Sequence, residues 1–389
     1  MKKIVFFFEV HQPRRIRYYK ANERGKNHEY FWDDRNAEIL NRVSDKCYIP
    51  ATQMLIDSGI KASISISGVL LEALLRTRKD VVEKFADYFE VGGGEIVAET
   101  YYHSLSSLWN ESEFKEQVKM DSDLIKTLFN RTPTTFRNSE LIYSNEIGRL
   151  AHEMGYKNII AEGTDQLIKS HDPNYLYENP YGQNLLLRNY RLSDDVSFRF
   201  SNRSWSDYPL FADKYAKWLA DAPGDVINLF MDYETFGEHQ WKETGIFEFM
   251  KALPKEVESR EMEFSTISEI GQSLKPRNTI SVPNYTSWAD TSRDLSAWLG
   301  NDMQMDAFEE LKSLSNCADK ETWRYLQTTD HLYYMSLAGV ADQEVHSYFN
   351  PYGSPYDAYI HFKNIIEDFR MKCSREKQST ASPYSLTTS

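Results

Sequence analysis

The stretch IVFFFEVHQP, which begins at Ile4, decides the fold of this chain. Its first five residues, Ile4–Phe8, are all β-branched or aromatic, and they run directly into polar side chains that include Glu9 and His11. A signal peptide needs about 7–15 apolar residues and a small-residue cleavage site, and this stretch offers neither. The pattern instead indicates a buried parallel strand that Pro13 ends. In α/β enzymes the carboxyl ends of such strands carry the reacting groups.

Short apolar runs of the same kind recur along the chain and alternate with amphipathic segments such as Leu70–Phe89, Glu113–Phe129 and Asn145–Tyr156. This alternation favours a parallel sheet with helices outside it. Seven or eight strand–helix units over roughly 270 residues suit a barrel or near-barrel. The predicted strands are Ile4–Phe8, Ala62–Ile66, Glu95–Ala98, Thr135–Phe136, Asn158–Ala161, Leu185–Leu187, Val226–Met231 and Phe264–Ile267.

The regular pattern is interrupted once and then ends. Residues 167–208 are irregular and rich in Asn, Asp, Pro and Tyr, which indicates long loops around one strand or hairpin. Beyond residue 276 the strand-like runs disappear, and amphipathic helical segments such as Met305–Asn316 and Ser354–Lys377 follow. We therefore expect a barrel domain over residues 1–275, a helical region over residues 276–376 and a disordered tail over residues 377–389.

Composition limits the possible partners and locations. The formal net charge of −13 argues against nucleic acid and acidic membrane surfaces as partners, and a neutral substrate fits better. No stretch approaches the roughly 18 apolar residues of a membrane helix. The three cysteines are far apart and form no CxxC pair, so the sequence suggests neither a disulfide framework nor a zinc site. Together with the absence of a signal pattern, this predicts a cytoplasmic protein.

Carboxylates follow two of the predicted strands. Glu140 comes after Thr135–Phe136, and Asp232 comes directly after Val226–Met231. An ionised carboxylate at the end of a buried strand is costly unless it is paired or used. Two carboxylates on different barrel strands can face each other across a cleft, and a glycosidase needs this arrangement: one attacks the sugar carbon and the other protonates the departing oxygen. At this point it stays open whether each is merely capped or solvated.

A metal site is the main competing interpretation of the polar clusters. His11, Asp232, Glu234 and His239 are all possible ligands. However, the sequence has no HExxH motif, and His239 lies seven residues after Asp232, which is not a short helical ligand spacing. We therefore expect no catalytic metal and no other cofactor.

Two further clusters are ambiguous. In SWADTSRDLSAWLGNDMQ, which begins at Ser287, Trp288 and Trp298 either border a groove or belong to the core. GGGE at Gly92–Glu95 follows a predicted helix and precedes a predicted strand, which is the reverse of the dinucleotide-binding order, so we reject a nucleotide site there.

Five motifs in the same order resemble glycoside hydrolase family 57, the family of α-amylases and other α-glucan-acting enzymes. HQP at His11–Pro13 resembles the first motif, and GGGEIV at Gly92–Val97 resembles the second. RNSELIY at Arg137–Tyr143 resembles the third, and MDYETFGEHQ at Met231–Gln240 resembles the fourth. Ser287–Gln304 resembles the fifth motif region of the family. HQP and Gly-x-x-Glu are short, so it is the order of all five that carries the resemblance.

The resemblance implies an α/β fold, namely an incomplete (β/α)7 TIM-like barrel followed by a C-terminal helical bundle that completes the active-site cleft. It implies Glu140 as the nucleophile and Asp232 as the acid/base of a retaining enzyme that needs no cofactor. The RNS that precedes Glu140, and the short chain, favour the α-amylase-like subgroup over the glucanotransferases and branching enzymes. The substrate-binding residues that we predict are His11, Gln12, Glu95, His239, Trp241, Trp288, Asp290 and Trp298.

The sequence thus predicts a retaining α-glucan hydrolase that cleaves α-1,4 linkages of starch, glycogen or maltodextrin. Its partner is an α-glucan oligo- or polysaccharide, and the oligomeric state is open. A 4-α-glucanotransferase or branching enzyme with the same carboxylates is the nearest alternative, because acceptor affinity rather than sequence separates transfer from hydrolysis. A metal-dependent carbohydrate deacetylase and a non-catalytic glucan-binding protein are more distant alternatives.

Overall fold

The computed structural model of this chain describes residues 1–169, 171–337 and 350–380. Contacts within the chain divide it into two units, which are residues 1–12 with 37–294 and residues 13–36 with 295–389. The division after Asp294 differs from the predicted one after residue 275. The reason is that the intervening segment pairs with the first unit: Thr286 bridges Tyr143, and Thr279 bridges Glu178.

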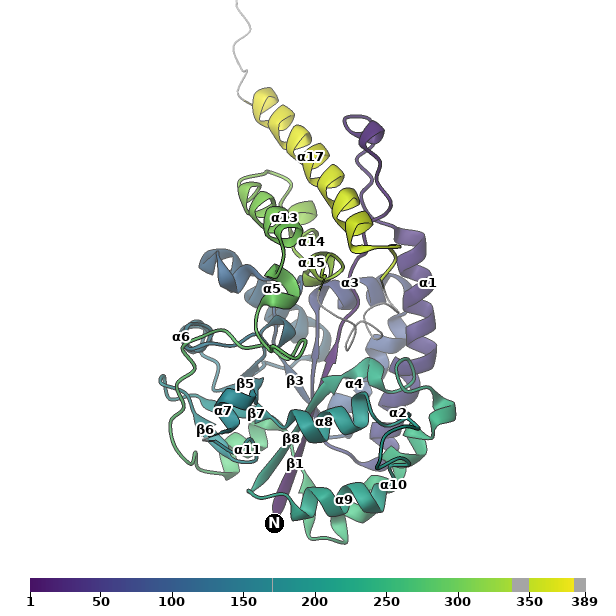
Figure 1. The fold of residues 1–389 in the computed structure, drawn as a ribbon, viewed down its shortest axis with the longest axis vertical. Helices are drawn as coiled ribbons and strands as arrows, with labels where there is room; N and C mark the ends of the chain where they lie inside the picture. Colours follow the sequence, from purple (N-terminus) through teal and green to yellow (C-terminus); the bar gives the residue numbers. More distant parts are fainter. Residues whose placement is uncertain (170, 338–349, 381–389) are drawn as a thin grey trace, which may run out of the picture. The chain divides into compact units, whose positions relative to one another are not determined.

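The first unit is built on parallel strands around β1 (Lys2–Val10). Strand β1 pairs in parallel with β2 (Ala62–Ile66) and β8 (Val226–Asp232), and β2 pairs with β3 (Glu95–Val97). A second parallel set contains β4 (Thr135–Phe136), β5 (Asn158–Glu162) and β7 (Asn184–Arg188). Figure 1 shows β1 and β8 side by side in the middle of this unit.

Two links join these sets into a barrel. Ala98, directly after β3, bridges Phe136 of β4 in parallel. On the other side the Asn189 amide, directly after β7, donates to the Asn228 carbonyl of β8 at 2.9 Å. In the described part of the chain, seven parallel strands thus follow the order β1, β2, β3, β4, β5, β7, β8, and the predicted (β/α)7 barrel class is confirmed.

The remaining described strands each pair with one barrel strand. Strand β6 (Leu176–Glu178) runs antiparallel to β7, and β9 (Met262–Phe264) pairs with the amino end of β1. The helices of the first unit are α1 (Asp33–Val43, which begins in the second unit), α2 (Ile49–Ser58), α3 (Gly68–Thr77), α4 (Lys79–Val91), α5 (Glu111–Phe129), α6 (Asn145–Glu153), α7 (Asp165–Ile168), α8 (Tyr190–Ser197), α9 (Ala212–Asp221), α10 (Ile246–Glu258) and α11 (Ile267–Ser273).

Strand β1 is apolar without alternation because both of its faces are buried. Val5 and Phe7 belong to one buried cluster that also contains Phe230, and Phe6 and Phe8 stack on each other with ring centres 5.3 Å apart. No side chain from Ile4 to Phe8 is exposed to solvent. A strand that is buried on both faces usually has a continuous hydrophobic sequence. The opening stretch of the sequence therefore correctly predicted a buried strand in this sheet.

The second unit is helical apart from its N-terminal segment. Its described helices are α12 (Ser296–Leu299), α13 (Asp302–Ser313), α14 (Lys320–Tyr325), α15 (Thr329–Tyr333) and α17 (Pro355–Thr380). The segment 13–36 is fixed to α17 by one buried carboxylate, Asp368, which accepts hydrogen bonds from the Gly25 amide and from the Tyr30 hydroxyl and lies 2.7 Å from His28 Nδ1.

A disulfide joins Cys317 to Cys373 within the second unit, with their Cα atoms 5.4 Å apart. The prediction that the cysteines form no disulfide is therefore wrong. Their separation of 56 residues matches no short spacing motif, so only the fold could bring them together. The cytoplasmic interpretation loses one of its two premises.

Three predicted elements differ from the structure. The run Leu70–Phe89 is two helices, because the backbone at Arg78 leaves helical geometry between α3 and α4. The last predicted strand is shifted: β9 ends at Phe264, and Ile267 begins α11. The predicted disordered tail began at residue 377, but α17 extends to Thr380; residues 381–389 lie outside the described part of the chain.

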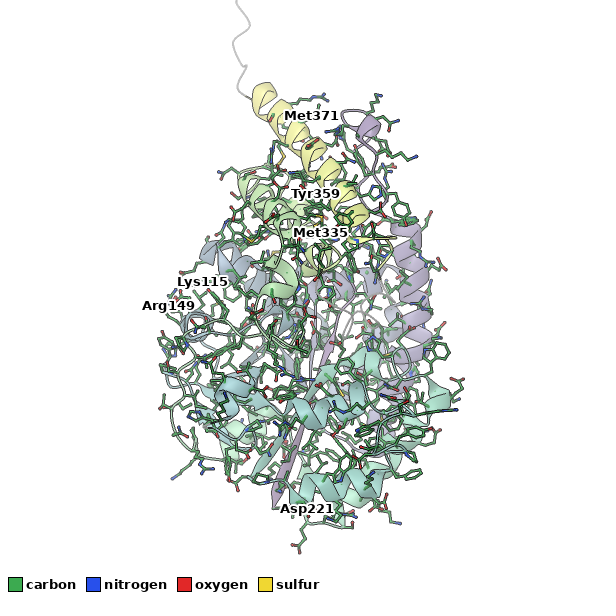
Figure 2. The ribbon with its side chains drawn as sticks, viewed as in Figure 1. Lys115, Arg149, Asp221, Met335, Tyr359 and Met371 are labelled. Atoms are coloured by element: carbon green, nitrogen blue, oxygen red, sulfur yellow. A yellow bond between two sulfur atoms is a disulfide. The ribbon has the colours of Figure 1, made fainter. Side chains whose placement is uncertain are left out.

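Ion pairs cover the outer surface of α5 and α6. Arg149 lies within ion-pair distance of Glu111, Glu146 and Glu153, and Lys115 pairs with two of the same carboxylates. Figure 2 shows both basic side chains at the edge of the molecule. Among the described residues, no helix combines the length and apolar character needed to cross a bilayer.

Candidate active site

Charged side chains collect at the carboxyl end of the barrel strands. One lies at or just after each of six strands: Glu9 on β1, Glu99 after β3, Arg137 after β4, Glu162 on β5, Arg188 on β7 and Asp232 on β8. All except the half-buried Asp232 are buried. Buried charges persist only when they are paired or used, so this end of the barrel is the candidate site.

Glu140 projects from a short 3₁₀ turn that follows β4. Its backbone φ of +59° lies in the left-handed region, and the φ of the next residue, Leu141, is +53°. Residues other than Gly, Asn and Asp seldom adopt this conformation, and two in succession store strain that the surrounding fold must hold. Its side chain is 15% exposed. The strained turn therefore presents a partly accessible carboxylate at the end of the barrel.

Trp288 is brought to Glu140 by strand-like pairing. Thr286 and Tyr143 exchange backbone hydrogen bonds of 2.8 and 2.9 Å, and the Trp288 amide donates to the Glu140 carbonyl at 3.4 Å. The indole Nε1–H then donates to Glu140 Oε2 at 3.1 Å. The guanidinium groups of Arg137 and Arg188 lie 5.0 and 6.0 Å from the indole centre, within cation–π range. These contacts hold the indole of Trp288 against the Glu140 carboxylate.

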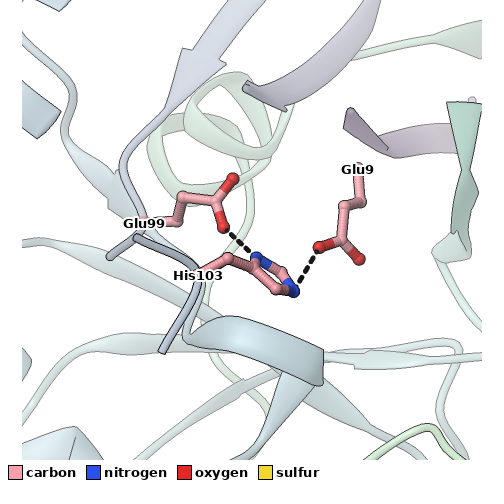
Figure 3. Close-up of side chains that lie close together, drawn as sticks. All are labelled: Glu9, Glu99 and His103. Carbon is pink, nitrogen blue, oxygen red and sulfur yellow. Dashed lines mark hydrogen bonds and ion pairs between the residues drawn. The ribbon is translucent and has the colours of Figure 1, made fainter. Parts of the chain in front are cut away.

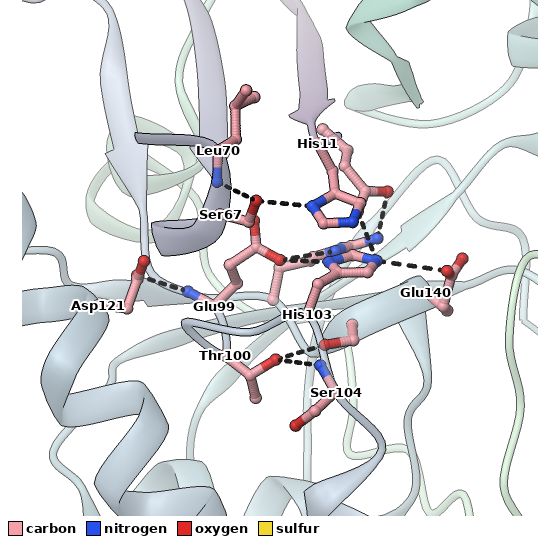
Figure 4. A network of polar contacts seen from close by, with 12 residues as sticks. His11, Ser67, Leu70, Glu99, Thr100, His103, Ser104, Asp121 and Glu140 are labelled. Carbon is pink, nitrogen blue, oxygen red and sulfur yellow. Dashed lines mark hydrogen bonds and ion pairs between the residues drawn. The ribbon is translucent and has the colours of Figure 1, made fainter. Parts of the chain in front are cut away.

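His103 contacts three carboxylates (Figure 4). Its Nδ1 lies 2.9 Å from Glu99 Oε2, and its Nε2 lies 3.3 Å from Glu140 Oε1 and 3.2 Å from Glu9 Oε1. Carboxylates accept hydrogen bonds, so both ring nitrogens must carry protons to donate. Burial alone would lower the pKa of His103, but the Glu9 charge and the hydrogen bonds to Glu140 and Glu99 raise it well above its usual value. His103 is therefore a buried imidazolium.

Arg137 supplies the second positive charge. Its guanidinium is fully buried; it forms an ion pair with Glu9 Oε2, and it lies 3.2 Å from Glu99 Oε2. Burial raises the pKa of Glu9 well above its usual value, although the charges of Arg137 and His103 oppose this. For Glu99, burial acts in the same direction, but the His103 hydrogen bond and the nearby cations leave its pKa lowered. His103 and Arg137 thus stabilise the charge of Glu99, whereas burial disfavours the charge of Glu9.

Glu9, Glu99 and His103 also have the composition of a metal site. One ligand atom from each lies within 4.8 Å of the others, and Figure 3 shows the two carboxylates on opposite sides of the imidazole ring. However, Arg137 already bridges both carboxylates. A divalent ion placed there would stand beside a buried guanidinium, and like charges in a low-dielectric interior repel strongly. The cluster is therefore better suited to holding His103 and Arg137 than to holding a metal.

Asp232 lies on the other side of the same barrel end. It is the last residue of β8 and stands in register with Glu9 of β1. Strands β1 to β3 separate β8 from β4 in one direction, and β5 and β7 separate them in the other. Glu140 and Asp232 therefore arise from opposite walls of one barrel end, as a cleft between two carboxylates requires.

Glu234 accompanies Asp232 but is held differently. It is buried, and its Oε1 accepts hydrogen bonds from the Tyr48 hydroxyl at 2.5 Å and from Gln12 Nε2 at 3.5 Å. Burial raises the pKa of Glu234 to about 8, and the charge of Asp232 adds to the effect. Glu234 is therefore neutral at physiological pH, whereas the neighbouring Asp232 remains partly accessible to solvent.

The model for glycosyl hydrolase family 57 matches residues 5–283 of this chain. The chain belongs to glycosyl hydrolase family 57. A protein of Methanocaldococcus jannaschii with the name "Putative alpha-amylase" is 45% identical over 391 residues, which cover 94% of this chain and 84% of that protein. Family 57 membership makes the chain a glycoside hydrolase, and the family resemblance predicted from its motifs is confirmed.

Solved structures agree in fold. A family 57 branching enzyme of Thermococcus kodakaraensis has a TM-score of 0.65 at 13% identity, covering 98% of this chain and 95% of that one. The 4-alpha-glucanotransferase of Thermococcus litoralis has a TM-score of 0.61 at 17% identity, covering 97% of this chain and 60% of that one. At these identities the likeness concerns the fold alone.

Several of the residues predicted to bind substrate lie near the candidate family 57 site. His11 stacks on His103 with ring centres 4.0 Å apart, and its Nδ1 lies 2.6 Å from Ser67 Oγ. Gln12 contacts Glu234, as described above. Asp290 follows Trp288 with a positive φ of +55°. His239 and Trp241 stand in the loop after β8, where Trp241 is 53% exposed.

Two other predicted binding residues have structural surroundings. Glu95 stands at the amino end of β3, and its carboxylate accepts hydrogen bonds from Ser63, Thr135 and Ser268. It therefore ties strands together at the opposite end of the barrel from Asp232. Trp298 is fully buried in α12 of the second unit and packs near Tyr333, so it offers no surface to a ligand. Both residues thus have structural roles, and their predicted contacts with substrate stay a prediction.

Sequence reasoning missed Glu9, Glu99 and His103 as site residues and left Arg137 without a role. A usable signal was present for one pair. Glu99 directly follows the predicted strand Glu95–Ala98, and His103 comes four residues later in AETYYH. The argument applied to the strand before Asp232 would have selected Glu99 as well.

The neutral state of Glu234 predicts a pH effect on stability. Between about pH 4.5 and pH 8 the unfolded chain loses the proton of this carboxyl while the folded chain keeps it. The unfolding free energy then falls as the pH rises, by at most about 1.4 kcal/mol per pH unit. Glu234→Gln cannot ionise, so its stability relative to the wild type should rise across this range and level off above pH 8. Urea denaturation at pH 5, 6.5 and 8 tests this, and a difference independent of pH would contradict a neutral Glu234.

Proposed function

We propose that this family 57 protein hydrolyses α-1,4 linkages of α-glucans such as starch, glycogen or maltodextrin, with retention of anomeric configuration. The observation that carries the proposal is the pair of carboxylates, Glu140 and Asp232, that arise from opposite walls at the carboxyl end of one barrel. The name of the Methanocaldococcus jannaschii relative supports an α-amylase activity.

In the proposed reaction Glu140 attacks the anomeric carbon and forms a covalent glycosyl-enzyme. Asp232 protonates the departing glycosidic oxygen and then removes a proton from the water that hydrolyses the intermediate. Both oxygens of Glu140 have a donor, His103 on one and Trp288 on the other. These donors hold the carboxylate in one orientation, and a reacting group held in a single geometry needs less reorganisation at the transition state.

Trp288→Phe tests the role of the indole N–H. Phenylalanine keeps an aromatic ring between Arg137 and Arg188 but cannot donate to Glu140. A hydrogen bond to a charged group contributes about 1.5–3 kcal/mol, so we expect kcat for maltoheptaose to fall roughly tenfold to a hundredfold while KM changes little. Trp288→Ala, which also removes the ring, should raise KM in addition. A Trp288→Phe enzyme with an unchanged kcat would limit Trp288 to packing or sugar contact.

Product analysis separates hydrolysis from its alternatives. The enzyme is incubated with maltoheptaose, with and without EDTA, and the chain lengths of the products are followed. New reducing ends without longer oligosaccharides support hydrolysis, and the accumulation of longer chains indicates a 4-α-glucanotransferase. Loss of activity in EDTA would indicate a metal-dependent reaction, and an unchanged substrate would indicate glucan binding only. We expect hydrolysis that EDTA does not affect, because Arg137 neutralises the carboxylates that a metal would need.

A further inference from the structure

A cavity of about 730 Å³ lies on the flank of the first unit, beside α8 and α9. Its lining includes Asn174, Asn189, Tyr190 and Trp218. The volume falls within the range of about 300–1,000 Å³ that is usual for small-molecule sites. The reaction proposed above does not use this cavity.

The Asn174 end of the cavity lies away from Asp232. The carbonyl of Asn174 accepts hydrogen bonds from the Asp225 and Val226 amides, at the very start of β8. Asp232 ends the same strand, six residues beyond Val226. At about 3.3 Å per residue this places the Asn174 end of the cavity roughly 20 Å along the strand from the candidate acid/base.

Asn174 carries an unused donor at the cavity. Asn189 caps α8, because its Oδ1 accepts from the Leu192 amide at 3.1 Å; its Nδ2 therefore donates to Asn174 Oδ1 at 2.9 Å. These contacts fix which atom of the Asn174 side chain is nitrogen. Its Nδ2 then has no hydrogen-bond partner within the described ranges, although Asn174 is only 3% exposed. This donor has no partner among the described residues at the cavity wall and is available to a ligand or to water.

Trp218 offers a second donor and a flat face. Its Nε1 has no hydrogen-bond partner in the part of the chain that the structure describes, and the side chain is half-buried at the cavity wall. Trp205 packs edge-on at 6.0 Å and Lys214 Nζ lies 5.1 Å from the ring centre, so the indole is held in place from its protein side. Tyr190 is fixed in the same way by Arg293, whose guanidinium lies 3.7 Å from the ring centre.

The charges at the cavity are balanced. Its lining contains two acidic residues, Asp165 and Asp172, and two basic residues, Lys169 and Arg191. A balanced wall gives an anion or a cation little net attraction. Aromatic faces and free N–H donors instead suit a neutral ligand with apolar faces and hydroxyl acceptors. We infer that this cavity is a second saccharide site, separate from the catalytic cleft, that binds a short stretch of neutral α-glucan. The choice of α-glucan as the saccharide rests on the proposed function.

The test measures binding and turnover separately. Full-length Asp232→Asn protein, which should not digest the glucan, is run in native gels that contain increasing soluble starch. We expect Trp218→Ala and Asn174→Asp, each added to this protein, to weaken the apparent affinity for starch at least fivefold. Lys217→Ala is the matched control, because Lys217 is the neighbour of Trp218 in α9 and its side chain is exposed to solvent. With Asp232 intact, Trp218→Ala and Asn174→Asp should keep the wild-type kcat for maltotriose.

The outcomes distinguish the two proposals. If starch retards the parent protein and neither Trp218→Ala nor Asn174→Asp changes this, or if starch does not retard it at all, the second site is refuted while hydrolysis of maltoheptaose still stands. If retardation depends on Trp218 but the wild type leaves maltoheptaose intact, the proposed function fails and the saccharide site stands. A fivefold loss in the Lys217→Ala control would mean that α9 as a whole, rather than the cavity, is responsible, and would overturn the assignment.

Discussion

Replacing Glu140 or Asp232 by alanine is expected to reduce kcat for maltoheptaose by about a thousandfold or more while the protein stays folded. The reason is that each carboxylate performs a bond-making step that no neighbouring group can take over. Asp221→Ala is the matched control, because this carboxylate ends α9 at the surface and pairs with Lys217. Near-wild-type kcat in either active-site variant would remove that residue from the mechanism.

Azide should distinguish the roles of the two carboxylates. In Glu140→Ala the missing side chain leaves a gap from which azide can attack an activated α-glucosyl substrate once, so the product should be the β-glucosyl azide. In Asp232→Ala a glycosyl-enzyme still forms when the leaving group is activated. Azide then attacks this intermediate and should give the α-glucosyl azide. Proton NMR of the isolated azides reads the anomer, and the same anomer from both variants would refute the double displacement.

Arg137→Met should be the most destabilising single change at this site. It leaves Glu9 and Glu99 buried without their shared guanidinium. Removing one partner of a buried ion pair costs about 3–5 kcal/mol of unfolding free energy. The loss should be smaller at pH 5 than at pH 8, because protonation relieves a carboxylate that has lost its partner. Urea denaturation at the two pH values measures both effects.

Arg149→Met is the control for this prediction. Arg149 pairs with three carboxylates, one more than Arg137, but its side chain is 29% exposed on the surface of α6 (Figure 2). Solvent screens exposed ion pairs, which therefore contribute little to stability, so this variant should remain close to the wild type. Equal losses from the two substitutions would show that burial of the Arg137 network does not matter to stability.

The local pattern of the sequence was sufficient for most of the strands and for the two carboxylates at their ends. Ala62–Ile66 and Thr135–Phe136 were predicted with their observed bounds, because their β-branched and aromatic residues favour strands. The burial of Trp298 and the position of Glu95 could not be predicted from the local pattern. A tryptophan or a glutamate in a motif looks the same whether it faces a cleft or the core.

The network around His103 could not be predicted because its contacts are non-local. Arg137 reaches Glu9 across 128 residues of sequence and Glu99 across 38. Each partner alone is an ordinary polar residue after a strand. Only the closed barrel brings the strand ends together and decides that Arg137 neutralises two acids. The same holds for Trp288, which lies 148 residues from the carboxylate that its indole contacts.

The attachment of segment 13–36 to Asp368 has a consequence for synthesis of the chain. Gly25, His28 and Tyr30 leave the ribosome before their common partner on α17, which follows 338 to 343 residues later. Strand β1 precedes this segment and strands β2 to β8 are translated between it and α17, so the barrel strands can pair before the early segment meets its partner. Domains translated in order usually fold in order. Here the second unit can complete its folding only after α17 has been made, and an expression product that stops after Asp294 would carry residues 13–36 without the helix that holds them.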